Sequence, residues 1–113
     1  MKNKIEISEL NNESNRTQNL ETIASFLRRD ALEVVIGANN GHIGGCLSSV
    51  ELLTAMYFGG IFKFDINDSK NSNRDKILVR GHLGPIRYPI FSLMGYIQRN
   101  ELSTYRQLGS RLQ

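Results

Sequence analysis

Apolar residues between positions 17 and 39 recur at the spacing of an amphipathic helix. They are Leu20, Ile23, Ala24, Leu27, Ala31, Val34, Val35 and Ala38. The opposite face is charged and carries Glu21, Arg28, Arg29, Asp30 and Glu33. Asn39, Asn40 and Gly41 follow, and since Asn and Gly tolerate the left-handed conformation that caps helices, the helix should end there. The pattern predicts a long helix that leads directly into a glycine-rich loop.

The loop at residues 41–48 holds three glycines around one histidine, in the order Gly41-His42-Ile43-Gly44-Gly45-Cys46-Leu47-Ser48. Glycines this close together cost backbone entropy, so the loop should need a positive φ or a close approach to a bound group. His42 is either a polar plug of this loop or a ligand-contacting side chain. A second glycine-histidine pair, Gly81-His82, makes the ligand-contacting role more attractive.

A second helix is predicted just after this loop. Ser48-Ser49-Val50-Glu51 has the form of a capping box, with Ser48 as N-cap and Glu51 reaching back from the third position. Residues 50–57 are apolar almost all round, which predicts a short helix buried on more than one side, ended by Gly59-Gly60. The Asp and Asn residues of the 62–74 loop lack the ordered spacing and closing glutamate of a calcium loop, so turns are the better interpretation.

The run Lys76-Ile77-Leu78-Val79 predicts a buried strand that leads into a second loop, Arg80-Gly81-His82-Leu83-Gly84-Pro85. In α/β folds, a strand followed by a glycine loop and a helix is where ligands bind. The backbone N–H groups of such a helix start favour an anion such as phosphate. The expected fold class is therefore α/β, mostly helical with one or two short strands.

Two further helices are predicted near the C-terminus. Residues 86–96 are apolar enough for a core helix, although Pro89 should delay its start or kink it. A last short helix opens at Asn100 and should place Leu102, Tyr105 and Leu108 on one face, with Gly109 at its end.

Chain length, charge and cysteine content limit the classes of protein to which this chain can belong. A chain of 113 residues makes one domain at most. Residues 1–16 are polar and form either a mobile arm or an arm that packs on a partner. The net charge of +3 is scattered, which favours a solvated surface over a nucleic-acid footprint. A single cysteine, no secretory signal and no apolar run of about 20 residues favour a soluble, cytoplasmic chain rather than a secreted or membrane protein.

Taken together, the two glycine-histidine loops and the segments between them resemble the N-terminal part of transketolases, over residues 17–113. The first histidine loop, the Ser48 helix start and the Arg74-Asp75 run before the second loop each have a counterpart in that family. Gly95-Tyr96 and the segment from Leu102 to Leu108 continue the likeness. Residues 106–113 are similar to the split, two-subunit type. The resemblance implies a polar arm at 1–16 and a partial thiamine-diphosphate-binding domain at 17–113.

The resemblance also implies roles for particular residues. His42 matches a histidine that contacts the sugar substrate and assists proton transfers, a task suited to imidazole near neutral pH. His82 and Gly81 match the loop that lies against the diphosphate of thiamine diphosphate. The family's Mg²⁺ motif, Gly-Asp-Gly, and its pyrimidine-binding domain are not found in this sequence. Magnesium ligands are therefore expected from a partner chain, and none is assigned here.

Two functions follow from this resemblance. In the first, the chain is part of a transketolase that moves two-carbon ketol groups between sugar phosphates, inactive alone and active in a hetero-oligomer with complementary transketolase chains. In the second, it is a non-catalytic truncated remnant or interaction protein with a transketolase-like fold. Both histidines favour the first function. Leu83, Pro85, Arg87 and Pro89, where the family has small residues and a smooth helix, favour the second.

Overall fold

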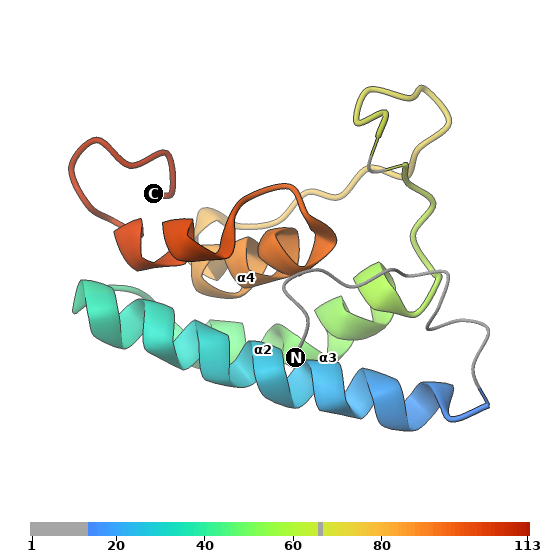
Figure 1. Ribbon diagram of the computed structural model, residues 1–113, viewed down its shortest axis with the longest axis horizontal. Coiled ribbons are helices and arrows are strands. Elements are labelled where there is room, and N and C mark those ends of the chain that lie inside the picture. Colours follow the sequence, from blue (N-terminus) through green and yellow to red (C-terminus); the bar gives the residue numbers. More distant parts are fainter. Residues whose placement is uncertain (1–13, 66) are drawn as a thin grey trace.

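A computed structural model describes residues 14–65 and 67–113. Its helices are α2 (Arg16–Ala38), α3 (Ile43–Phe58) and α4 (Gly84–Met94). Two short 3₁₀ helices, η1 (Gly81–Leu83) and η2 (Arg99–Thr104), precede and follow α4. Figure 1 shows the long α2 along one side, with α3 and α4 lying against it and the C-terminal segment beyond α4. Most of the predicted arm at 1–16 lies outside the described residues, and Arg16 already belongs to α2.

The core is formed where α2, α3 and α4 meet, since each of these helices contacts the other two. Its fully buried members include Leu27, Cys46, Val50, Phe58, Ile86, Ile90 and Leu93. A second cluster joins the end of α2 to the C-terminal segment and consists of Val34, Leu102, Tyr105 and Leu112. The long predicted helix is thus confirmed, and its apolar face is the one that packs.

The turn after α2 also follows the prediction. Asn39 adopts the left-handed conformation at the C-cap, with φ of 49°. Gly41 has φ of +132°, so the positive φ expected of this loop is confirmed at one glycine. A Cβ atom at Gly41 would lie 3.1 Å from the Cγ2 atom of Val35, which makes the turn tight as well as left-handed.

The predicted capping box is wrong, because α3 begins at Ile43 and includes Ser48 in its interior. The Ser48 hydroxyl donates to the carbonyl of Gly45 at 2.9 Å, and Glu51 pairs with Arg28 of α2. Two glycines in the first turn cost about 1 kcal/mol each relative to Ala. The burial of Cys46 and Val50 on one face of α3 offsets that cost, so the helix extends through the glycine-rich segment.

The predicted strand at residues 76–79 does not form, and the described residues contain no β-strand, so the α/β class is not confirmed for them. Ile77 is 39% exposed and Leu78 is 101% exposed, so the run is not buried either. A strand needs a backbone partner, and no described segment supplies one at this position. In Figure 1 the segment crosses from the 62–74 loop to α4 as an extended trace.

The loop at 62–74 forms turns of the kind predicted. The Asp65 carboxylate accepts from the backbone N–H of Asn67 at 2.9 Å. The Asn71 side chain accepts from the backbone N–H of Asn73 at 2.8 Å. These local side-chain bonds explain the Asp and Asn content of the loop.

The last two helices differ from the prediction in their bounds. Helix α4 starts at Gly84, earlier than expected, and runs through Pro89 to a left-handed cap at Gly95. Pro85 lies in the first turn, where proline favours a helix start, and the buried Pro89 is held by the core. After Tyr105 the chain turns at Arg106, with φ of 61°, so Leu108 is fully exposed instead of packing beside Leu102 and Tyr105.

Candidate functional site

The two histidines singled out in the sequence lie side by side. The ring centroids of His42 and His82 are 4.1 Å apart, and the ring planes are inclined by 36°. His42 occupies the N-cap position of α3, and His82 lies in η1. Both side chains are exposed. The fold therefore joins the two glycine-histidine loops into one surface site.

Cys46 fixes the two loops relative to each other. Its thiol, on the first full turn of α3, donates to the carbonyl oxygen of His82 at 3.5 Å. The backbone N–H of Ile86 is directed at the same sulfur, and the cysteine is fully buried. Burial raises the pKa of the Cys46 thiol, and the Ile86 hydrogen bond only partly opposes this. The neutral thiol thus acts as a buried link between the start of α3 and the start of α4.

Arg80 is a third member of the site, and one that sequence reasoning missed. Its Nη2 atom lies 3.5 Å from Nδ1 of His82. An arginine N–H facing Nδ1 favours the tautomer that carries its proton on Nε2, which leaves Nε2–H free to donate. The place of Arg80 directly before the Gly81-His82 pair was the available signal in the sequence.

The start of α4 offers fewer donors to an anion than the sequence predicts. The Gly84 N–H donates to the carbonyl of Gly81, and Pro85 has no N–H. The Ile86 N–H faces the Cys46 thiol and acts to lower its pKa. Gly81 itself is exposed and has open space around its Cα. An anion at this site would therefore be bound mainly by His82 and Arg80, with Gly81 leaving room for it.

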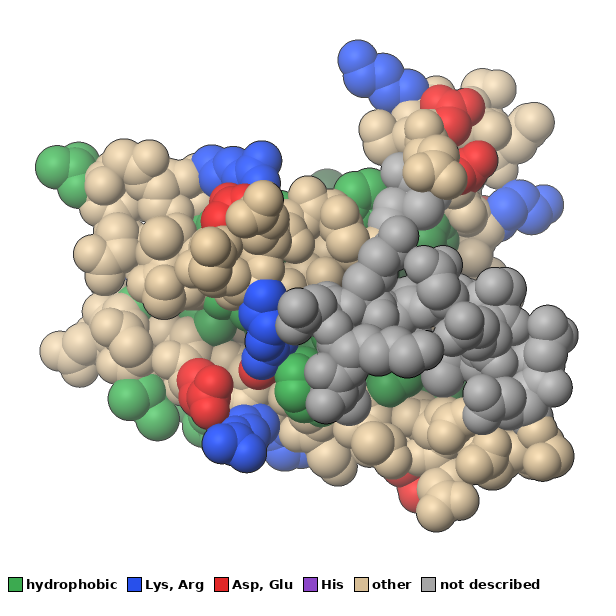
Figure 2. All heavy atoms as spheres, viewed as in Figure 1, with side chains coloured by type: hydrophobic (Ala, Val, Ile, Leu, Met, Phe, Trp, Pro, Cys, Tyr) green, Lys and Arg blue, Asp and Glu red, His purple; other side chains and the backbone are tan. Residues whose placement is uncertain are grey.

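Within residues 14–65 and 67–113, no three His, Cys, Asp or Glu side chains are grouped closely enough to hold a metal ion. On the face shown in Figure 2, basic and acidic side chains lie close to one another across the described part of the surface. None of the described helices combines the length and the apolar character needed to cross a membrane.

Comparison with known families identifies the class of protein. Residues 19–113 match the family described as transketolase, thiamine diphosphate binding domain. The match covers most of the chain, so the chain belongs to this family, and the resemblance drawn from the two histidine loops is confirmed.

Individual relatives include a protein named transketolase and proteins named as transketolase subunits. The chain is 35% identical over 94 residues to the 6-deoxy-6-sulfo-D-fructose transketolase subunit SqwG of a Clostridium species, covering 82% of this chain and 34% of that protein. It is 33% identical over 98 residues to one subunit of the apulose-4-phosphate transketolase of Phocaeicola vulgatus, covering 86% of this chain and 34% of that protein. Human transketolase is 28% identical over 98 residues, covering 86% of this chain and 16% of that protein. The chain thus spans about a third or less of the length of these relatives.

Proposed function

We propose that this chain is part of a split transketolase that transfers two-carbon ketol groups between sugar phosphates with thiamine diphosphate. It is active only with complementary chains that supply the Gly-Asp-Gly magnesium site and the pyrimidine-binding domain. The observation that carries the proposal is the pairing of His42 and His82 at 4.1 Å on an exposed surface, in a chain of the thiamine-diphosphate-binding family. Relatives named as transketolase subunits support the need for a partner.

The residues of the site suit different parts of this task. Thiamine diphosphate, when bound, supplies the carbanion chemistry of the thiazolium ring. His82 donates from Nε2 to a diphosphate oxygen, and Arg80 beside it adds positive charge. His42, on the adjacent loop, contacts the sugar and moves a proton to or from its hydroxyl groups. Gly81 leaves space for the diphosphate beside the backbone.

Exposed apolar residues on the described surface favour contact with a partner chain. Leu52 of α3 is 63% exposed, and Leu78 in the unpaired 76–79 segment is 101% exposed. Exposed apolar side chains, one on a helix face and one in a segment without a strand partner, favour coverage by another polypeptide segment. The proposed assembly is therefore a hetero-oligomer in which complementary transketolase chains cover these residues.

The test is a co-purification from the source cell, with a tag at Met1, followed by assays for thiamine diphosphate and for ketol transfer. The expected eluate holds a partner with a Gly-Asp-Gly motif, the cofactor, magnesium and activity. The purified chain alone should bind no cofactor and transfer no ketol group. Turnover by the chain alone would show that the need for a partner is wrong.

One observation favours the second candidate, a non-catalytic protein with this fold. At the start of α4 the Gly84 N–H donates to the Gly81 carbonyl and Pro85 has no N–H, so these two positions give a diphosphate little support. For such a protein, the tagged chain would return with no transketolase partner and no thiamine diphosphate. His42→Ala and His82→Ala would then change neither the ketol transfer nor the thiamine diphosphate measured in the eluate.

A further inference from the structure

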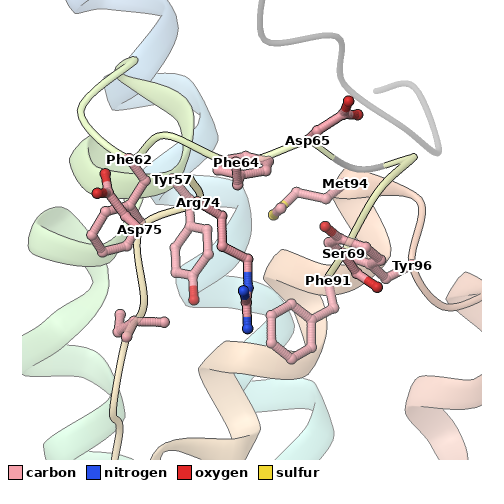
Figure 3. Close-up of a pocket in the computed structure, with 11 residues that line it drawn as sticks. Tyr57, Phe62, Phe64, Asp65, Ser69, Arg74, Asp75, Phe91, Met94 and Tyr96 are labelled. Carbon is pink, nitrogen blue, oxygen red and sulfur yellow. The ribbon is translucent and has the colours of Figure 1, made fainter. Parts of the chain in front are cut away.

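A cavity away from the two histidines lies between the 62–74 loop, the end of α3 and α4. Its volume is about 380 Å³, within the range of sites for small molecules. Figure 3 shows rings from three parts of the chain around it, namely Tyr57, Phe62, Phe64, Phe91 and Tyr96. Its lining residues include neither histidine of the candidate site nor Gly81.

The aromatic walls are held in place by contacts with one another. The ring of Tyr57 meets Phe62 edge to face at 5.2 Å between centroids, and it meets Phe91 in the same way at 6.4 Å. Phe91 in turn meets Tyr96 edge to face at 6.0 Å. Such contacts fix ring orientations, so the faces that line the cavity are set before anything binds. Flat apolar walls of this kind suit a planar ring.

One end of the cavity is positively charged. Figure 3 shows the Arg74 guanidinium and the Tyr57 hydroxyl directed toward the same end of the cavity. A single hydrogen bond from Arg74, to the carbonyl of Asn71 at 2.9 Å, leaves further N–H groups to donate. Arg87 lies behind this wall, its Cζ atom 5.5 Å from the Phe91 centroid, with a buried Nε that has no partner among the described residues. Burial raises the pKa of Tyr57, so its hydroxyl remains a donor near neutral pH.

The two acidic side chains of the cavity point elsewhere. Asp75 accepts from the backbone N–H of Lys63 at 2.7 Å. Asp65 accepts from the N–H of Asn67 and lies toward Tyr96, whose pKa it helps burial to raise. In Figure 3 both carboxylates lie away from the Arg74 guanidinium. The end formed by Arg74 and Tyr57 is therefore free to receive a negative group.

We propose that this cavity binds a small planar aromatic molecule that carries one anionic oxygen group, a carboxylate or a phosphate. The ring lies between Phe62, Phe91 and Tyr96, and the anionic group accepts from the Arg74 guanidinium and the Tyr57 hydroxyl. Ring burial and a charge-assisted hydrogen bond thus act at opposite ends of the same ligand. Neither half of such a ligand alone satisfies both ends.

The test uses phenyl phosphate, with benzyl alcohol and inorganic phosphate as probes of each half, titrated into the full chain and followed by the NMR signals of its aromatic rings. Phenyl phosphate should shift the signals of Tyr57, Phe91 and Tyr96 and bind at least about tenfold more tightly than either half. Benzoate, titrated in the same way, distinguishes a carboxylate from a phosphate ligand. No shift with either anion would overturn the proposal.

Two variants of lining residues and one control variant distinguish this site from non-specific binding to an apolar surface. Arg74→Gln should weaken phenyl phosphate about tenfold and leave benzyl alcohol unchanged, because it removes one charge-assisted hydrogen bond. Lys70→Gln makes the same charge change on the same loop outside the cavity and should change neither. Ser69→Phe, at an exposed lining position, should fill the cavity and abolish both. Equal binding by wild type and Arg74→Gln would contradict the proposal, whatever the outcome of the ketol-transfer assay.

Discussion

The Arg99 guanidinium binds both oxygens of the Asp30 carboxylate, with Nη1 to Oδ2 at 2.8 Å and Nη2 to Oδ1 at 2.6 Å. The pair joins η2 to the middle of α2 across 69 positions of sequence. Asp30 is only 3% exposed, and the guanidinium also lies over the Phe26 ring, 4.7 Å from its centroid. The hydrogen bond to Asp30 raises the pKa of Arg99, so the arginine keeps its charge in the folded chain.

Loss of Arg99 should therefore destabilise the fold. Arg99→Ala leaves a buried carboxylate without its partner, and breaking such a pair costs about 2–4 kcal/mol of unfolding free energy when one partner is partly exposed. Urea unfolding measured by circular dichroism checks this. Arg29→Ala breaks an exposed ion pair with Glu33 on the same helix and should cost less than about 0.5 kcal/mol. Similar losses for the two variants would contradict the structural role of Arg99.

Asp30 also shows what a local pattern leaves out. The sequence placed it on the charged face of the helix, whereas it lies beside Leu27 and Ala31 on the packed face. Nothing near Asp30 in the sequence reveals this, because its partner Arg99 is distant and belongs to a different element. The helix itself was predictable, because the helical spacing of its apolar residues can be recognised within one continuous segment.

The same contrast explains the failure at residues 76–79. Ile77, Leu78 and Val79 favour a strand locally, yet strand formation depends on a second strand that the described chain does not provide. The prediction that Leu108 packs beside Leu102 and Tyr105 was wrong for a related reason. The chain turns at Arg106, and Leu112 packs in that cluster instead of Leu108. For the candidate site, the glycine neighbours pointed to both histidines in the sequence, while their contact, the link through Cys46 and the position of Arg80 beside His82 depend on tertiary packing.

The proposed roles of the two histidines predict different effects of their substitution in the copurified complex. His42→Ala should lower turnover by about 10²–10⁴-fold with a smaller effect on cofactor affinity, because a positioned proton-transfer group is lost. His82→Ala should chiefly weaken thiamine diphosphate binding, because a donor to the diphosphate is lost. Steady-state kinetics over a range of cofactor concentrations, with the copurified complex, separates these effects. Negligible and equal effects of both changes would argue against the assigned roles.

The pair of Glu101 and Arg111 should make stability depend on acidic pH. Arg111 donates to both oxygens of Glu101, at 2.8 and 2.7 Å, and this hydrogen bonding lowers the pKa of the Glu101 carboxyl in the folded chain. The unfolded chain, with a glutamate pKa of about 4.3, takes up this proton first as the pH falls. The stability from this pair is therefore present above pH ~4.3 and is lost as the pH falls through the lower folded pKa.

Thermal melts between neutral and strongly acidic pH check this. The Tm of Glu101→Gln should be lower than that of wild type at neutral pH, and the difference should shrink as the pH falls. Glu21→Gln, which removes an exposed carboxylate of α2, controls for net charge. A difference between wild type and Glu101→Gln that stays constant with pH would count against the pair.

Cys46 should react slowly with thiol reagents in the native chain. It is fully buried, and burial raises its thiol pKa, so both access and the thiolate fraction are low. Alkylation by iodoacetamide, followed by mass spectrometry, should be at least about 100-fold slower for the native chain than for the chain in urea, because reaction requires opening. Native reaction at the rate of a small thiol would show that the link between the two histidine loops is open.

The turn at Gly41 limits the amino-acid substitutions that this position can accept during evolution. At φ of +132°, with Val35, Pro85 and Tyr105 around the position where a Cβ would stand, the backbone tolerates glycine and little else. Every amino-acid-changing point mutation in a glycine codon introduces a side chain. Position 41 therefore has no amino-acid change within one nucleotide that avoids a Cβ at this φ, so Gly41, directly before His42, has no stepwise route to replacement.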